Sequence, residues 1–249
     1  MSGRLLTRRE ALLLGVWPFS WFLPAREAQC GGARFRILRR GRSARRYLHI
    51  HGDEETARRA LAQHMKTARG HALMVTGTKR TVALLGGSLD PNRMFSREGA
   101  EANLRRLNPA WTPEQLRAAL DRLDRERPRL LRHLLPPRGG LLFALHNNAR
   151  GYSVETEIPI SRLTALPKRS EPHEFFLCTD PRDYELLAKG PYNAVLQDRP
   201  MGEEDGSCSR LAARLGVRYL NLEVAIGRED LQREMLAWAD KIIPERYSS

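Results

Sequence analysis

Three residues of this 249-residue chain have the types and spacing of a zinc-binding set. His51 and Glu54 lie three positions apart, so both side chains can turn toward one ion at a junction between a strand and a helix. His146 directly follows the apolar segment 141–145 and therefore projects from the end of a predicted strand. Two imidazoles and one carboxylate are a ligand set of catalytic zinc sites, which keep a fourth position for water. The alternative is a helix-capping Glu54 beside histidines of structural use.

Two further polar clusters also follow predicted strands. They are Asp90-Pro91-Asn92-Arg93, in a stretch of turn residues, and Glu223, late in an apolar segment. In open α/β sheets, functional groups gather at the carboxyl ends of the strands, so we expect all these residues to meet there. Taken singly, each has a plain structural interpretation: a strand-end cap for Asp90, a surface ion pair for Arg93 and a half-buried sheet residue for Glu223.

Together these motifs resemble those of the zinc carboxypeptidase superfamily, and most closely its succinylglutamate desuccinylase and aspartoacylase branch. His51-Gly52-Asp53-Glu54 is similar to the family's first ligand box, and Asp90-Pro91-Asn92-Arg93-Met94-Phe95 to its Asp-Leu-Asn-Arg-x-Phe box. Leu145-His146-Asn147-Asn148 resembles the segment around the third ligand, and Leu222-Glu223-Val224 the segment of the general base. All four occur in the family's order and cover roughly residues 47–240.

The resemblance implies a role for each matched residue. His51, Glu54 and His146 are expected to bind Zn²⁺, and Glu223 is expected to move a proton between water and the leaving amine. Asn92 and Arg93 are expected to hold a substrate carboxylate, for which the guanidinium fork is well shaped. Asp90 is expected to accept a hydrogen bond from His51 and so to set its tautomer.

Several family features have no certain counterpart in this sequence. Arg80 fits an oxyanion-stabilising arginine by position, with Lys79 and Arg69 as competitors. Tyr152 and Tyr192 are both possible counterparts of the mobile tyrosine of the peptidases. The separate C-terminal domain of the aspartoacylases is not expected, and His49 is placed beside the ligands rather than among them.

The elements that must position these residues alternate between apolar strands and amphipathic helices. Thr112, Pro113 and Gln115 form a capping box at the start of a long helical segment, which Pro128 is expected to break or kink. The stretch 86–93 is predicted to be a loop. Strands are predicted at 47–51, 71–75, 80–85, 141–145, 174–178, 193–197 and 218–224, and helices at 55–68, 112–134, 181–189, 207–215 and 229–242. This alternation predicts a single α/β/α domain with a mixed, mostly parallel sheet.

The N-terminus and the charge concern where the protein acts. Arg8 and Arg9 precede a short apolar run that ends at Leu23, which resembles a twin-arginine export signal. We therefore expect a signal peptide at 1–29, a zinc hydrolase domain at 30–249, a periplasmic or secreted location, and no stable membrane insertion after cleavage. The net charge of +13 comes without a nucleic-acid-binding motif, so no nucleic-acid partner is expected.

The three cysteines show no metal-binding spacing. Cys178 and Cys208 are expected to be buried small hydrophobes, with a disulfide as the alternative. The predicted function is zinc-dependent hydrolysis of an amide bond next to a carboxylate, in a small peptide or an N-acyl amino acid. The alternative is an exported basic binding protein that keeps the fold and has lost catalysis.

Overall fold

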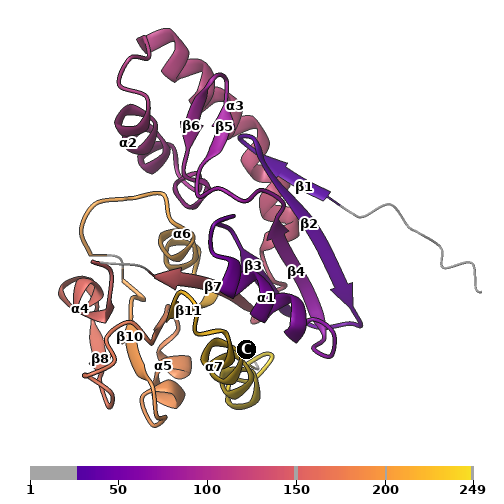
Figure 1. Cartoon of the computed structure of the whole chain (residues 1–249), viewed down its shortest axis with the longest axis vertical. Helices are drawn as coiled ribbons and strands as arrows, with labels where there is room; N and C mark the ends of the chain where they lie inside the picture. The colour runs from indigo at the N-terminus through magenta and orange to yellow at the C-terminus, as the bar shows by residue number, and fades with distance from the viewer. Residues whose placement is uncertain (1–26, 149–150, 200, 248–249) are drawn as a thin grey trace, which may run out of the picture.

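A nine-stranded sheet forms the centre of the protein (Figure 1). The computed structural model describes residues 27–148, 151–199 and 201–247. The strand order is β1-β2-β4-β3-β7-β11-β9-β10-β8, and a separate hairpin joins β5 to β6. The strands are β1 (Glu27–Cys30), β2 (Ala33–Arg40), β3 (Arg45–His49), β4 (Gly70–Val75), β5 (Val82–Leu84), β6 (Gly87–Leu89), β7 (Leu141–Asn148), β8 (Leu163–Ala165), β9 (Phe175–Cys178), β10 (Asn193–Leu196) and β11 (Arg218–Ala225).

The four central strands β4, β3, β7 and β11 run parallel to one another. Antiparallel pairs flank them, so that β2, β9 and β10 run against the other six strands of the sheet. Strands β7 and β11 are buried along almost their whole length because both faces of the sheet are covered. The predicted mixed, mostly parallel α/β fold is confirmed.

Helices cover both faces of the sheet. One hydrophobic cluster packs α2, α3 and α6 against one face, and a second packs α1, α5 and α7 against the other. Cys208 belongs to the first cluster and Cys178 to the second, and both are free thiols. The helices are α1 (Glu55–His64), α2 (Arg97–Leu107), α3 (Pro113–Leu134), α4 (Val154–Glu157), α5 (Pro181–Leu187), α6 (Cys208–Leu215) and α7 (Glu229–Ile242), with short 3-10 turns at Pro91–Arg93 and Ile158–Ile160.

Several elements differ from the sequence prediction. Residues 33–40, where the sequence analysis predicts no strand, form β2, in which Ala33, Phe35 and Ile37 are buried and the residues between them are exposed. The loop predicted at 86–93 contains β6, and the strand predicted at 80–85 shortens to β5, outside the main sheet. Helix α3 keeps its predicted capping box at Thr112 and Gln115. It continues through Pro128, so the predicted break does not occur.

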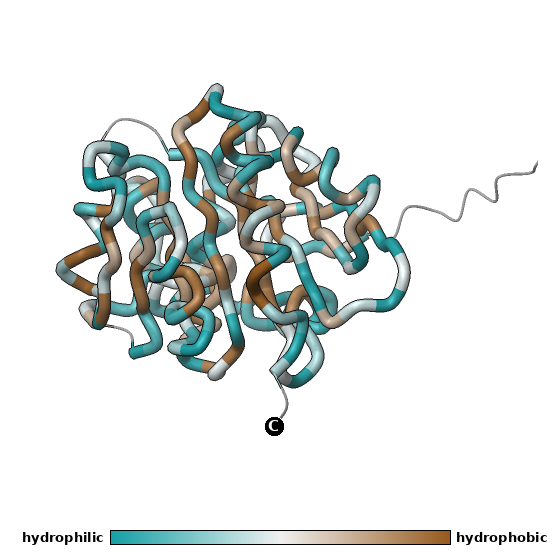
Figure 2. Tube along the Cα trace, turned by 90° about the horizontal axis from the view of Figure 1, so that it is seen from below, coloured by the Kyte–Doolittle hydropathy of each residue, from teal (hydrophilic) through white to brown (hydrophobic). Residues whose placement is uncertain are grey.

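Most of the predicted signal peptide lies outside the described residues. Its last part does not: Glu27–Cys30 forms the edge strand β1, which pairs with β2 and buries Ala28 and Cys30. No helix of the described ranges is long and apolar enough to cross a membrane. Figure 2 agrees, since hydrophobic segments are interrupted by hydrophilic ones all along the coloured trace.

Candidate active site

The three predicted metal ligands meet at the carboxyl ends of β3 and β7. The His51 Nδ1 atom lies 2.8 Å from Glu54 Oε1, and the His146 Nδ1 atom lies 3.1 Å from Glu54 Oε2. All three side chains are buried, and their candidate ligand atoms lie within 4.8 Å of one another. Tetrahedral zinc holds its nitrogen and oxygen donors about 2.0–2.2 Å away, so two donors on one ion lie roughly 3.3–3.6 Å apart. The trio therefore fits a zinc site with small adjustments of its side chains.

Asp90 supports this trio from the other side of the first imidazole. Its Oδ1 atom lies 2.8 Å from His51 Nε2 and also accepts from the Asn92 backbone amide at 2.9 Å. The backbone amide of Asp90 donates to the Asn103 side chain of α2. A proton held on Nε2 leaves the Nδ1 lone pair of His51 free for a metal.

The electrostatics of the trio are dominated by its mutual contacts. Burial opposes a charge on His51, but the Glu54 and Asp90 carboxylates outweigh it and raise the pKa of His51 to about 9. Burial alone would raise the pKa of Glu54, yet His146 and His51 hold that pKa well below its ordinary value. The pKa of Asp90 falls to about 2, because His51 and Arg80 overcome the effect of its burial. The Glu54 and Asp90 carboxylates are thus ionised near neutral pH, whereas His51 carries a second proton there, which a metal would displace from Nδ1 on binding.

Gly52 allows a second loop to approach the first. An added Cβ at this position would lie 2.6 Å from the Gly77 carbonyl oxygen and 2.7 Å from that of Lys79. The Gly52 amide donates to the Lys79 carbonyl at 3.1 Å. Only glycine permits this contact, which brings residues 77–80 against the loop that carries His51 and Glu54.

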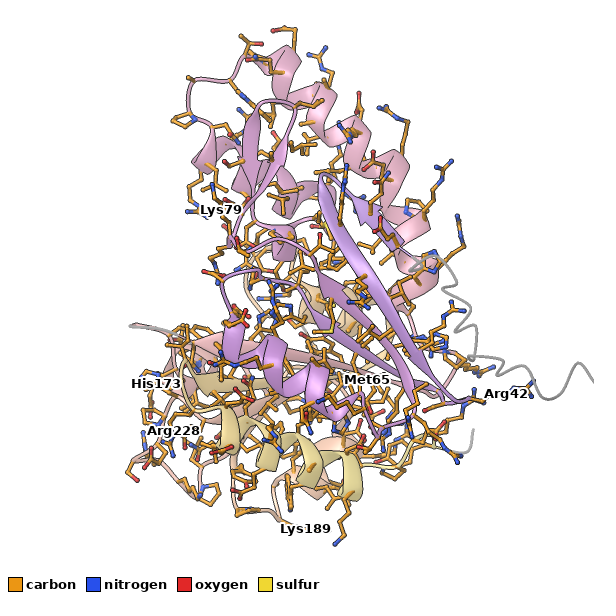
Figure 3. The ribbon with its side chains drawn as sticks, turned by 45° about the vertical axis from the view of Figure 1, so that its right-hand side comes forward. Arg42, Met65, Lys79, His173, Lys189 and Arg228 are labelled. Atoms are coloured by element: carbon orange, nitrogen blue, oxygen red, sulfur yellow. The ribbon has the colours of Figure 1, made fainter. Side chains whose placement is uncertain are left out.

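Arg80 is the basic residue that this approach places at the site. Its guanidinium lies 3.2 Å from Glu54 Oε1 and 3.6 Å from Asp90 Oδ2. The two competitors do not line the pocket: Lys79 is exposed at the edge of the molecule in Figure 3, and the Arg69 side chain packs near Gly41.

Glu223 lies beside His146 through strand register. The two are partners in the parallel pairing of β7 with β11, where neighbouring strands run roughly 4.8 Å apart. The Glu223 carboxylate is buried and accepts a hydrogen bond from Asn221 at 3.0 Å. Burial raises its pKa to about 7, and the nearby Glu54 charge adds to that rise. A carboxyl group with this pKa can both take and return a proton near neutral pH.

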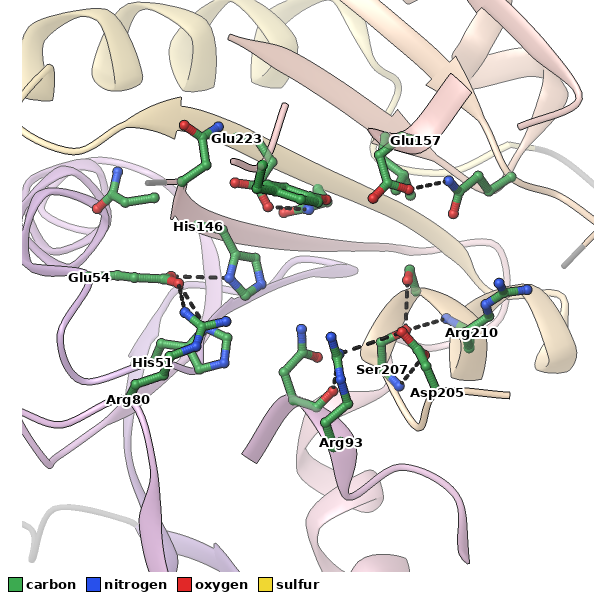
Figure 4. A pocket seen from close by; sticks show the side chains of 18 of the residues that line it. His51, Glu54, Arg80, Arg93, His146, Glu157, Asp205, Ser207, Arg210 and Glu223 are labelled. Atoms are coloured by element: carbon green, nitrogen blue, oxygen red, sulfur yellow. Dashed lines mark hydrogen bonds and ion pairs between the residues drawn. The ribbon is translucent and has the colours of Figure 1, made fainter. Parts of the chain in front are cut away.

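These side chains share one cavity of about 490 Å³ (Figure 4). Arg93 lines it and lies 3.6 Å from the Asp205 carboxylate. Asn92 also lines it, but its Oδ1 atom accepts from the Cys208 amide at the start of α6, so part of its role is to hold that helix. Tyr152 is in the wall, whereas Tyr192 packs against Phe176 and Trp238 on the other face of the sheet.

His49 does not join the ligands. It is fully buried, its Nε2 atom contacts the Glu54 backbone carbonyl at 3.1 Å, and burial lowers its pKa to about 4. The cavity also has polar residues that no sequence motif predicts, namely Glu157, Gln197, Asp205, Ser207 and Arg210. They come from loops and short helices, so only the folded chain brings them together.

Neither a family model nor a curated protein matches the chain, but solved structures of similar shape exist. One is a succinylglutamate desuccinylase/aspartoacylase from Rhodobacter sphaeroides, with 14% identity, a TM-score of 0.45, and 90% of this chain and 65% of that chain covered. Another is the ectoine utilization protein EutE (DoeB) from Ruegeria pomeroyi, with 14% identity, a TM-score of 0.44, and 87% of this chain and 64% of that chain covered. A third is a succinylglutamate desuccinylase from Silicibacter sp. TM1040, with 13% identity, a TM-score of 0.41, and 87% of this chain and 63% of that chain covered.

The chain thus spans 63–65% of the length of these solved structures. Two of the three carry the desuccinylase or aspartoacylase name of the branch that the four sequence motifs resemble. At such identities and TM-scores the likeness assigns neither an activity nor a substrate to this chain. The chemistry of the site follows from its own residues: two imidazoles, a carboxylate and a buried proton acceptor in one pocket, with a guanidinium on the wall.

Proposed function

We propose that the protein is a zinc-dependent hydrolase that cleaves an amide bond next to a carboxylate, in a small peptide or an N-acyl amino acid. The observation that carries the proposal is the convergence of His51, Glu54 and His146, with Glu223 in register beside His146. His51, Glu54 and His146 would hold the ion. A bound Zn²⁺ supplies a Lewis acid and lowers the pKa of its water.

Glu223 has the properties of the group that moves the proton. As the carboxylate it accepts a proton from the attacking water, and it delivers that proton to the amine nitrogen when the carbon–nitrogen bond breaks. Because Glu223 is buried and its pKa is raised to about 7, it can hold the proton between the two steps. Its hydrogen bond from Asn221 fixes the carboxylate in the pocket.

Arg93 supports the carboxylate part of the proposal. Its guanidinium already has a carboxylate neighbour, Asp205, and about a third of its side chain is exposed (32%). A substrate carboxylate that displaced Asp205 would find a planar group suited to two parallel hydrogen bonds. Arg80, between Glu54 and Asp90, supplies a second positive charge at the metal end of the cavity.

The first experiment measures metal and activity together. Protein purified without added zinc should contain about one zinc per chain, and the zinc-loaded protein should hydrolyse some members of a panel of N-acyl amino acids. His51→Ala and His146→Ala should each remove most of the metal and the activity. His133→Ala, which changes a histidine of α3 outside the pocket, should remove neither. Stoichiometric zinc in the His51→Ala/His146→Ala double variant would refute the assigned site.

A further inference from the structure

The pocket holds two buried carboxylates that have only neutral hydrogen-bond partners. One is Glu223, which accepts from Asn221, and the proposed function uses it. The other is Glu157, to which the proposed chemistry gives no role. The other buried carboxylates in and beside the pocket lie against histidines or arginines: Glu54 against His51, His146 and Arg80, and Asp90 against His51 and Arg80.

Glu157 is held firmly in place. It is the last residue of α4, only 8% exposed, and its Oε2 atom accepts from Gln197 Nε2 at 2.5 Å. Gln197 is itself buried and also donates to Ser161 at 3.2 Å. Among the residues that the structure describes, no cationic side chain lies within 4.0 Å of the Glu157 carboxylate. Burying a carboxylate without a cation is costly, so this position calls for a positively charged ligand.

Glu157 belongs to the same cavity as the catalytic residues. The Tyr152 hydroxyl is close enough to Glu223 and Glu157 that both carboxylates, after burial, raise its pKa well above the ordinary value. Figure 4 shows Glu157 on the same side of the pocket as Glu223, with Arg93 on the other side. A substrate held by Arg93 and hydrolysed beside Glu223 can therefore extend toward Glu157.

The shape of the Glu157 end narrows the chemistry of the group that it would bind. Ile160 and Leu177 are among the residues that line the cavity, and their apolar side chains suit an alkyl chain. Gln197 already occupies the Oε2 atom of Glu157, which leaves the Oε1 atom for a single strong contact. A primary ammonium, a compact point charge, needs only one oxygen, whereas a guanidinium gains from two.

We propose that Glu157 determines specificity by binding an ammonium group at the end of a short alkyl chain of the substrate. The substrate class is then an amide that carries both a carboxylate, held at Arg93, and a primary amine, held at Glu157. This inference rests on the proposed function for the bond that is cleaved. The recognition of the amine does not depend on catalysis and can be measured by binding alone.

The test compares matched pairs of compounds that differ by the ammonium group. Nα-acetyl-L-lysine is paired with Nα-acetyl-L-norleucine, and 6-aminohexanoyl-glycine with hexanoyl-glycine, so that the amine lies on either side of the amide. Dissociation constants are measured by calorimetry on the zinc-loaded Glu223→Gln variant, and kcat/KM on the wild-type protein. The ammonium member of at least one pair should be favoured by about 10- to 100-fold in both measurements, the worth of a charge-assisted hydrogen bond.

Variants at Glu157 then assign the preference. Glu157→Gln should abolish it by weakening the ammonium compound to the level of its neutral partner, and the shorter Glu157→Asp should keep part of it. Glu155→Gln, an exposed carboxylate on the same short helix, should leave it unchanged. Thermal unfolding of each variant verifies that the fold is kept.

The outcomes separate this inference from the proposed function. A binding preference that disappears in Glu157→Gln, without hydrolysis of any compound by the wild type, supports the amine site and refutes the hydrolase. Hydrolysis without an ammonium preference, or a preference that survives in Glu157→Gln, overturns the role of Glu157 and leaves the hydrolase standing. Absence of any preference in binding overturns the amine site whatever the activity.

Discussion

At the scale of single residues, the chemistry of the site depends on neighbours that are distant in sequence. His146 and Glu223 are 77 positions apart by number and adjacent by strand register. Glu54 joins them from the residue that precedes α1, while Asp90 comes from a 3-10 turn that follows β6. Each of these side chains also makes contacts that hold the fold. Its part in the chemistry must therefore be separated from its part in stability by substitutions that change one of the two at a time.

Glu223→Gln separates proton transfer from metal binding. The amide keeps the shape and the hydrogen bond to Asn221 but cannot accept a proton, so turnover should fall by about 10²–10⁴-fold or more. Zinc content, measured by atomic absorption, should stay near one per chain because no ligand is changed. Glu155→Gln is the matched control and should keep full activity. Full activity in Glu223→Gln would contradict the assignment of the base.

Arg93→Ala addresses the substrate carboxylate. Substrates with a free carboxylate should lose on the order of 10–100-fold in kcat/KM, the worth of a hydrogen bond between charged groups. Versions capped as amides should change little. Arg93→Lys should restore only part of the loss, because a point charge cannot form the two-pronged contact. Equal losses for free and capped substrates would remove Arg93 from carboxylate recognition.

At the scale of elements, Asn147 connects the strand of His146 to two helices of the adjacent layer, α1 and α7. Its Oδ1 atom accepts from the Ala57 amide of α1 at 2.7 Å, and its Nδ2 atom donates to Gln232 of α7 and to the Val224 carbonyl of β11. Gln232 in turn donates to the His146 carbonyl at 2.8 Å. The Asn147 amide thus fixes α1, which starts directly after Glu54, relative to the strand that carries His146.

Asn147→Ala should therefore weaken both the fold and the metal site. It leaves buried polar groups without partners, at about 1–3 kcal/mol each, so we expect a loss of roughly 2–4 kcal/mol in the free energy of unfolding. For a chain of this size the melting temperature should fall by about 5–15 °C. Zinc affinity, measured by competition with a chelator, should also fall. Gln63→Ala, which changes an exposed residue of α1, is the control and should alter neither quantity.

Elements rich in large apolar residues were predicted from the sequence, and elements with few of them were missed. Strand β7 begins with five consecutive apolar residues, 141–145, and most residues of β11 are apolar, so both strands were predicted and His146 and Glu223 were placed near their carboxyl ends. Strand β2 was missed although its arginines alternate with the buried residues Ala33, Phe35 and Ile37, which is the period of two of a half-buried strand. Helix α2 was missed because few of its residues are large and apolar, although Ser96 caps it.

The residues of the candidate site also differ in how well the sequence predicts them. Residues inside short motifs, such as His51, Glu54 and Asp90, could be found from the sequence alone. Glu157 and Gln197 could not, because each stands in an unremarkable local sequence and their contact depends on how β8, β9 and β10 pair at the edge of the sheet. Spacing along the chain carries no information about such long-range neighbours.

At the scale of the whole molecule, strand β1 limits where the predicted signal peptide could be cleaved without loss of structure. Glu27–Cys30 pairs with β2, Cys30 is fully buried, and the Gly31 amide donates to Glu126 of α3 at 2.7 Å. Cleavage after residue 29, the end of the predicted signal peptide, would remove most of strand β1. A cut at or before residue 26 would keep it.

Two truncated proteins test this expectation. A chain that starts at Glu27 should unfold at the temperature of the full-length protein. A chain that starts at Gly31 loses the β1 ladder and the burial of Ala28 and Cys30, so it should lose at least about 2 kcal/mol and melt roughly 4–8 °C lower. Equal melting temperatures for the two would show that β1 contributes nothing to stability.

Strand β11 sorts its side chains strictly by parity. Tyr219, Asn221 and Glu223 line the cavity, while Leu220, Leu222 and Val224 belong to the hydrophobic cluster beneath α7. Deleting one residue early in this strand would exchange the two sets, placing Val224 beside His146 and the Glu223 carboxylate in the hydrophobic cluster. Substitutions in β11 therefore keep each side chain on its face of the sheet, whereas a change in the length of the strand does not. In homologous chains, insertions and deletions should fall in the loops that flank β11 and never within it.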